Sequence, residues 1–201
     1  MTLKKIAAAC ILAACATPAL AGSSVYHAHL NYLQFSGNYV TTDSDLDVTG
    51  GSVEFQGQMT RSWIARLGYL YGKDSDYDIQ MDQMYGSIGY ILSNDGNTAH
   101  IFELGLSRSE VDVPYGNGNL KLDSDFYGVG YRYWWHLGRR WEAELDLNAW
   151  QAFNADDAED DFQFSGQLRV NYYFADKWGT GLQYKYNEDA DTLGLYVRYV
   201  F

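Results

Sequence analysis

Ten charged side chains alternate with apolar residues along the chain, at the spacing that directs neighbouring side chains of a β-strand to opposite faces. The ten are Arg66, Arg132, Arg169, Lys185, Arg198, Glu54, Glu103, Glu142, Glu144 and Asp146. If these side chains share a confined interior, they should form ion pairs, because an unpaired buried charge is costly. On the wall of a water-filled passage, the same side chains would select ions by charge. The residues leave two interpretations open: a packed polar core or a narrow charged pore.

One cross-strand contact can be predicted in detail. If Trp135 pairs with Trp141 across the turn "HLGRR", the register sets Arg132 directly opposite Glu144. Several glycines fall on the same face as the charged set. They leave room either for bulky neighbours or for water, and the sequence does not distinguish these two uses.

Histidines are the other candidates for chemistry. The alternation places His27 and His29 on the same face as the charged set, whereas His100 and His136 lie beside short turns. Nucleophilic catalysis requires a nucleophile next to a base that a third group orients. No such arrangement is evident here, so the sequence predicts no enzyme, no catalytic residue and no cofactor.

Two acidic segments, "DSDLD" and "DSDYD", begin like a calcium-binding loop. Neither has the glycine expected at the sixth position, and the second has no glutamate at the twelfth. We therefore predict no metal site and interpret both segments as solvated surface. Acidic residues in the longer connections, such as Asp43, Asp45, Asp156 and Asp157, would raise the local concentration of cations.

The elements that must position these residues are strands. Alternation recurs in ten segments: about 24–36, 51–60, 63–73, 80–92, 99–108, 122–135, 141–151, 161–174, 178–187 and 192–201. Each is close to, or somewhat longer than, the roughly nine to eleven residues of a tilted membrane-crossing strand. No apolar run after residue 21 approaches the roughly 18 residues of a membrane helix.

Connections and aromatic residues support a membrane setting. Short turns alternate with generally longer acidic connections, as in barrels with short periplasmic turns and long external loops. Five of the six tryptophans flank the short turns: Trp63, Trp134, Trp135, Trp141 and Trp178. Tryptophan is enriched at membrane interfaces, so an aromatic belt is expected at that level.

The first 21 residues are predicted to be a signal peptide, and 22–201 a single domain. Lys4 and Lys5 precede an apolar run, and Ala19 and Ala21 form an A-x-A cleavage site. The segment "LAAC" also resembles a lipoprotein processing box ending at Cys15, but the ordinary spacing of the A-x-A site favours cleavage after it. Cleavage would remove both cysteines and leave a formal charge of −14 from 12 basic and 26 acidic residues. This charge argues against nucleic acid as a partner.

The final strand resembles the recognition signal that the outer-membrane assembly machinery reads. Its residues are Leu195, Val197, Tyr199 and Phe201. With the repeated hairpins, the whole domain resembles small Gram-negative outer-membrane β-barrel proteins, the group of OmpA-type membrane domains and porin-like barrels. The resemblance implies a place in the cell outer membrane, contact with lipid and lipopolysaccharide, and passage through the barrel assembly machinery.

We therefore predict an all-β protein, a transmembrane antiparallel up-and-down barrel of ten strands, with eight strands as the alternative. The expected function is a small porin-like or structural barrel with a narrow charged lumen and acidic external loops, and we expect a monomer. The alternative is a surface binding module, an adhesin or receptor that uses the loops. A lipid-modifying enzyme of the outer membrane is the less favoured interpretation.

Overall fold

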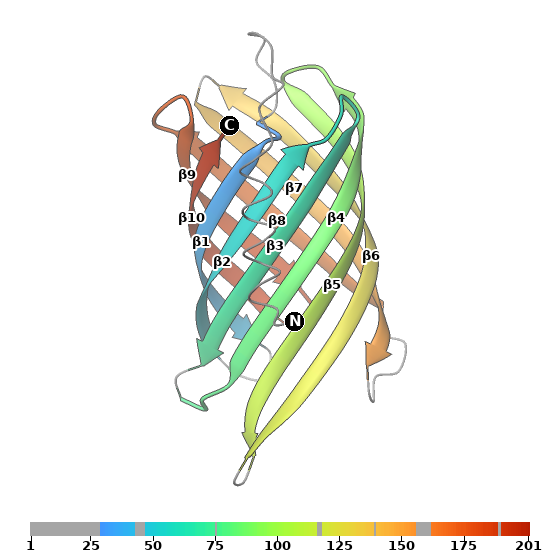
Figure 1. Ribbon diagram of the computed structural model, residues 1–201. Coiled ribbons are helices and arrows are strands. Elements are labelled where there is room, and N and C mark those ends of the chain that lie inside the picture. The colour runs from blue at the N-terminus through green and yellow to red at the C-terminus, as the bar shows by residue number, and fades with distance from the viewer. Residues whose placement is uncertain are drawn as a thin grey trace.

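The computed structural model describes residues 29–42, 47–74, 76–115, 118–138, 140–155, 162–188 and 190–201. Within them, ten antiparallel strands follow one another in order, and pairing of the first strand with the last closes a barrel (Figure 1). The strands are β1 (Tyr32–Thr42), β2 (Asp47–Gln58), β3 (Trp63–Asp74), β4 (Gln80–Asn94), β5 (Thr98–Tyr115), β6 (Gly118–Gly138), β7 (Trp141–Ala155), β8 (Phe162–Tyr173), β9 (Trp178–Asn187) and β10 (Ala190–Val200). The prediction of ten strands is confirmed. No helix in this part of the chain is both long and apolar enough to cross a membrane.

The predicted strand boundaries are wrong in two regions. The first strand was expected over 24–36 but spans 32–42, because Val200 at the end of β10 pairs with Tyr32 and sets where β1 begins. The segment between the fifth and sixth strands was expected to be an acidic loop. Instead β5 and β6 continue through it and pair as far as Tyr115 and Gly118, because residues 111, 113, 120 and 122 keep the apolar alternation of a hairpin. The other boundaries agree to within four residues.

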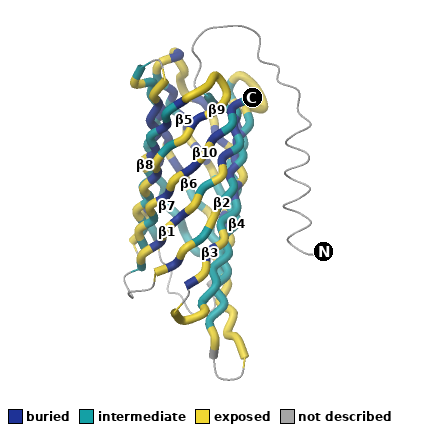
Figure 2. The backbone as a smooth tube through the Cα atoms, turned by 90° about the vertical axis from the view of Figure 1, so that its left-hand side faces the viewer, coloured by how far each residue is buried: buried dark blue, intermediate teal, exposed yellow. Residues whose placement is uncertain are grey.

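The apolar faces point outward and the charged faces point inward. Leu195 and Leu106 are 66% and 62% exposed, whereas Arg198 and Arg132 are 0% and 1% exposed. Figure 2 shows this alternation as exposed and buried residues following one another along the strands. A soluble barrel would bury the apolar set, so the inverted pattern is that of a barrel surrounded by lipid.

The two ends of the barrel differ. The turns β2–β3, β4–β5, β6–β7 and β8–β9, together with Phe201, lie at one end, which we call the short-turn end. The connections β1–β2, β3–β4, β5–β6, β7–β8 and β9–β10 lie at the other, the long-hairpin end. There the β5–β6 hairpin projects beyond the rest of the wall (Figure 1).

The aromatic belt at the short-turn end needs one correction. Trp63, Trp141 and Trp178 are outward and 44–48% exposed. Trp134, expected among them, is 2% exposed and points into the lumen, because it pairs with the inward residue Glu144.

Candidate functional site

The centre of the lumen holds a network of ion pairs that crosses the barrel. Arg66 on β3 donates from Nη2 to Glu103 Oε2 on β5 at 2.6 Å. Its Nη1 donates to Asp146 Oδ2 on β7 at 3.1 Å. Strands β3 and β7 are four places apart in the closed ten-strand order, so this guanidinium joins nearly opposite walls.

Arg132 on β6 shares both acidic partners of Arg66. Its Nη2 donates to Glu103 Oε1 at 2.6 Å, and its Nε lies 2.9 Å from Asp146 Oδ1 as an ion pair. The guanidinium also donates to the side-chain oxygen of Gln56 on β2, again four strands away. Because Arg132 is 1% exposed, protein groups rather than water balance its charge.

Arg169 and Arg198 form the other half of the network. Arg169 on β8 donates to Glu54 Oε2 on β2 at 3.0 Å and to Glu144 Oε2 on β7 at 3.2 Å. Arg198 on β10 donates to the second oxygen of Glu144. Its guanidinium carbon also lies 3.9 Å from the ring centroid of Tyr32, a cation–π contact.

We call this set the central network. It contains four guanidinium groups and four carboxylates, so its formal charges cancel: Arg66, Arg132, Arg169, Arg198, Glu54, Glu103, Glu144 and Asp146. Each of these residues is at most 7% exposed. Such burial is tolerated only where every charge is matched, since removing one partner leaves an uncompensated ion.

The two other predicted lumen charges lie apart from the central network. Glu142, near the short-turn end, accepts hydrogen bonds from Tyr173 at 2.9 Å and from Trp134 Nε1 at 3.3 Å, and lies 2.5 Å from His29 Nδ1. Lys185 is half-buried on the long-hairpin side, and its ammonium forms no ion pair with any residue that the structure describes.

The predicted pairing of Arg132 with Glu144 is wrong. Arg132 faces Asp146, and Glu144 faces Trp134. The register shifts between His136 and Gly138, where the turn begins with a glycine at φ 151°, so Trp135 pairs with Ala143 rather than with Trp141. Glu144 is instead neutralised by Arg169 and Arg198.

An apolar cluster lies between the central network and the short-turn end. Its members are Leu30, Ile64, Ile91, Ala99, Ile101 and Trp134. Ile64, Ala99 and Ile101 have no exposed surface. Side chains of this kind inside a lumen exclude water, so the cluster is a second obstruction in series with the central network.

Inward glycines accommodate bulky neighbours, which answers the question that the sequence left open. A Cβ on Gly128 would lie 2.5 Å from Trp150 Cε3, and one on Gly68 would lie 2.1 Å from Tyr85 Cζ. Tyr85 in turn donates to Glu54 of the central network. The aromatic rings therefore lie over the neighbouring strand, because the glycines beneath them have no side chain.

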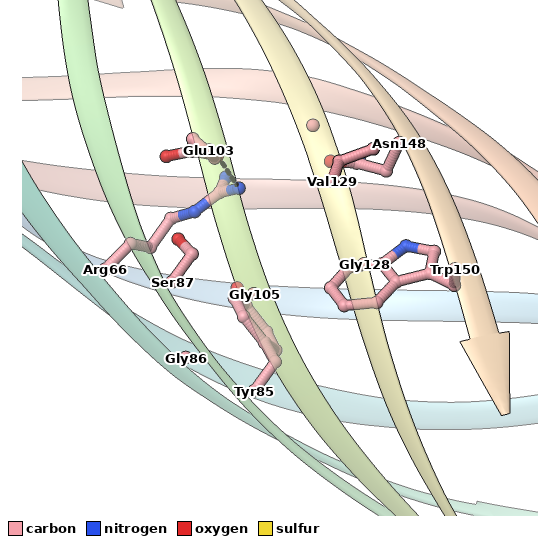
Figure 3. Close-up of a pocket in the computed structure, with 11 residues that line it drawn as sticks. Arg66, Tyr85, Gly86, Ser87, Glu103, Gly105, Gly128, Val129, Asn148 and Trp150 are labelled. Atoms are coloured by element: carbon pink, nitrogen blue, oxygen red, sulfur yellow. Dashed lines mark hydrogen bonds and ion pairs between the residues drawn. The ribbon is translucent and has the colours of Figure 1, made fainter. Parts of the chain in front are cut away.

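A small cavity lies beside the central network (Figure 3). Arg66, Ser87, Gly128, Asn148 and Trp150 are among its lining residues, and its volume is about 20 Å³. That volume holds a water molecule but is far below the roughly 300–1,000 Å³ of a typical ligand pocket.

Sequence reasoning missed three neutral members of this interior. Tyr32 donates to Glu54 at 2.6 Å, and Gln34 accepts from Arg198 Nε at 3.1 Å. Gln56 accepts from Arg132 and donates to the backbone oxygen of Leu30 at 3.0 Å. The period of two places Tyr32, Gln34 and Gln56 on the same strand face as the charged set. This shared face is the signal that could have identified them.

Several predicted features lie outside the described residues: the signal peptide 1–21, the start of the domain at 22–28, His27, and the acidic positions Asp43, Asp45, Asp156 and Asp157. In the segment "DSDYD", Asp74 accepts the backbone N–H groups of Asp76 and Tyr77, both at 2.8 Å, and so caps a turn. Among the described residues, no group of three potential metal ligands is close enough to hold an ion.

The four residues of the predicted assembly signal lie on the outer face of β10 and at its end. Leu195 and Val197 are 66% and 42% exposed. The ring of Tyr199 lies 4.8 Å from that of Trp178, and Phe201 stacks on Phe55 at 5.7 Å.

Comparisons with known proteins agree with this architecture. A family model described as "Outer membrane protein beta-barrel domain" matches residues 6–201. No curated protein matches the chain. Among solved structures, a bacterial polysaccharide outer membrane secretin is 9% identical with a TM-score of 0.51, over 85% of this chain and 65% of that one. The KdgM porin is 6% identical (TM-score 0.46; 84% and 99% covered), and the N-terminal barrel domain of Pseudomonas aeruginosa OprF is 12% identical (0.43; 85% and 98%). At these identities the likeness concerns the fold alone.

Proposed function

The chain belongs to the outer membrane protein beta-barrel family and lies in the outer membrane of Gram-negative bacteria, and we propose that it is a closed structural barrel. Its lumen is cross-braced rather than open, and the barrel holds the β5–β6 hairpin above the cell surface. We thus favour a structural barrel over a porin-like one, and we propose that the barrel serves to present the β5–β6 hairpin at the cell surface.

The central network is the observation that carries the proposal. Arg66 links β3 to β7, Arg169 links β8 to β2, and Arg132 links β6 to β2. Links between opposite walls occupy the middle of the lumen, where a solute or hydrated ion would have to pass. Breaking one requires separating buried opposite charges, which is unfavourable in a low-dielectric interior.

The orientation of the barrel in the membrane can be inferred from the different lengths of the connections at its two ends. Outer-membrane barrels place short turns in the periplasm and longer connections outside, so the long-hairpin end is proposed to face the medium. The acidic connections then form an external rim, and the belt of Trp63, Trp141 and Trp178 lies at the periplasmic interface. We further propose that Leu195, Val197, Tyr199 and Phe201 are read by the barrel assembly machinery.

The closed wall also supports the proposal that the protein is a monomer. Each strand is paired on both sides within the barrel wall, so no strand needs a second subunit to complete its hydrogen bonds in lipid. The proposed contacts with lipid and lipopolysaccharide are made by the exposed apolar side chains and by the groups just above them.

Planar-bilayer recording tests the proposal. The reconstituted protein should give no steady conductance steps. The double variant Arg66→Ala/Asp146→Ala removes one cross-lumen link without changing net charge, and combining it with Ile64→Gly also opens the apolar cluster. This triple variant should conduct, while Arg108→Ala, which removes an exposed arginine outside the lumen, should stay silent. Steady cation-selective steps from the unmodified protein would contradict the proposal and favour the narrow charged pore.

A further inference from the structure

The β5–β6 hairpin is longer than either neighbouring strand. The outermost pair between β4 and β5 is Gln80–Asp112, and the outermost pair between β7 and β6 is Ser124–Ala155. Residues 118–123 of β6 therefore pair with β5 on one side, and no strand in the described part of the chain pairs with them on the other. We call these six residues the free edge.

A free edge has a defined binding chemistry. In an antiparallel ladder, every second residue directs its backbone N–H and C=O away from the existing partner. Such a row accepts a further strand, and proteins use it to bind extended peptides by strand addition. The free edge spans six residues, or about 20 Å of strand.

One face of the projecting hairpin is apolar. Val111 pairs with Leu122, and Val113 pairs with Leu120, so the four side chains form a continuous patch. Leu120 and Leu122 are 49% and 52% exposed. Because they are two residues apart on the free edge, an added strand would meet them with its own alternate side chains.

The other face is charged and mainly acidic. Arg108 pairs with Asp123 at 2.7 Å, and Lys121 with Glu110 at 2.7 Å and with Asp112 at 3.4 Å. With Asp125, which also lies near Arg108, the face carries four carboxylates against two cations. On the free edge itself this face carries Lys121 and Asp123, so a basic side chain of an added strand would be favoured beside Asp123 and at the Asp125 end of the hairpin.

We propose that the free edge binds an extended cationic peptide segment with apolar residues at alternate positions. The backbone groups select the extended conformation, Leu120 and Leu122 select the apolar positions, and the excess of carboxylates selects lysine or arginine between them. The inference rests on the proposed function in that the long-hairpin end must face the medium.

Two other occupants fit less well. The connection at 156–161 follows β7 in the chain, but its sequence, "DDAEDD", is acidic and contains only one apolar residue. A second copy of the chain would bring the same acidic excess against this face. Both occupants remain as outcomes of the experiment below.

The probe is a fluorescent eight-residue peptide that alternates lysine and valine, with the protein in zwitterionic lipid nanodiscs and binding followed by anisotropy. Two isomers carry N-methyl groups on the odd or on the even residues. Strand addition uses one set of amides, so one isomer should lose at least tenfold in affinity while the other binds like the parent. Equal binding by the parent and both isomers would mean adsorption by charge and would overturn the proposal, as would failure of the parent to bind.

Protein variants locate the site. Leu120→Ser/Leu122→Ser should weaken binding about tenfold, whereas Leu137→Ser, which changes an exposed leucine at the short-turn end, should not. Faster migration of unheated samples in gels checks that each variant is folded. Tighter binding after replacement of 156–161 by a glycine-serine linker would show that this connection covers the edge, and a dimer that depends on Leu120 and Leu122 would show a second copy; either result overturns the proposal. The conductance experiment is independent, so failure here and failure of the closed-barrel function can be told apart.

Discussion

At the scale of single residues, the stability of the interior depends on whether each buried charge has a partner of opposite sign, and less on how many charges there are. Arg132, at 1% exposure, has no access to water, and its partners are supplied by β2, β5 and β7. Arg108, on the outer face of the projecting hairpin, forms a similarly short ion pair with Asp123 that stays in contact with solvent. Screening and hydration make such exposed pairs weak, whereas breaking a buried pair leaves an uncompensated charge.

Arg132→Ala should therefore destabilise the barrel far more than Arg108→Ala. We expect the free energy of unfolding to fall by about 3–5 kcal/mol for the buried arginine. For the exposed arginine we expect a fall of less than about 1 kcal/mol. Urea unfolding in lipid vesicles, followed by tryptophan fluorescence, measures both, and equal losses would contradict the buried network.

The glycines give a second test at this scale. In Gly128→Ala, the new methyl group would meet Trp150 and the backbone oxygen of Ala149, at 2.5 and 2.6 Å. We expect a loss of about 1–3 kcal/mol in the free energy of unfolding, as for other overpacked interiors. Gly37→Ala is the matched control, because nothing lies within 4 Å of its added carbon. If both variants unfold alike, Trp150 does not pack against Gly128.

At the scale of elements, pairing and pattern determined where strands end. The acidic residues between 108 and 122 predict a loop, yet residues 109–115 belong to β5 and residues 118–121 to β6. The charges lie on one face as cross-strand pairs, and the apolar residues lie on the other. Strand β1 shows the opposite error, since its ladder with β10 begins only at the pair Tyr32–Val200.

The charged face of the hairpin predicts a pH response. A hydrogen bond from Lys121 lowers the pKa of the Glu110 carboxyl below its ordinary value. Because the folded pKa is below the unfolded one, this contact stabilises the hairpin above the unfolded value of about 4.3 and is lost as pH falls through the folded value. An NMR titration of the Glu110 carboxyl should show the low midpoint, and Lys121→Met should move it upward. Leu137→Met, far from this pair, should leave the midpoint unchanged; a midpoint insensitive to Lys121 would mean that the pair does not form in solution.

At the scale of the whole molecule, closure joins the first strand to the last. β1 pairs with β10 from Tyr32–Val200 to Thr42–Ala190, so no open edge remains in the wall. Lipid offers no hydrogen-bond partner to backbone groups, which makes this closure a requirement of the environment. Strand β10 therefore completes the cylinder, and it also carries most of the proposed assembly signal.

Deleting Phe201 distinguishes a role of this residue in the folded barrel from a role in recognition by the assembly machinery. If the residue is read by the assembly machinery, the amount of folded protein in cell outer membranes should fall several-fold, while refolding of the purified chain in detergent should be nearly unchanged. Phe174→Ser, an exposed phenylalanine at the same end, is the control and should assemble normally. Equal losses in cells and in detergent would mean that Phe201 acts only through its stacking on Phe55.

The sequence by itself determined the class of the protein, the number of strands, and the face of each strand that meets lipid, because these depend on a local period of two. It also placed Arg66, Glu103 and Asp146 inside, since they share that period. Which charges meet was decided only by the tertiary structure: the register shift at Gly138 moved Arg132 from Glu144 to Asp146. Links such as Arg66–Asp146 depend on closure of the barrel, which brings together strands far apart in the chain and leaves no trace in local alternation.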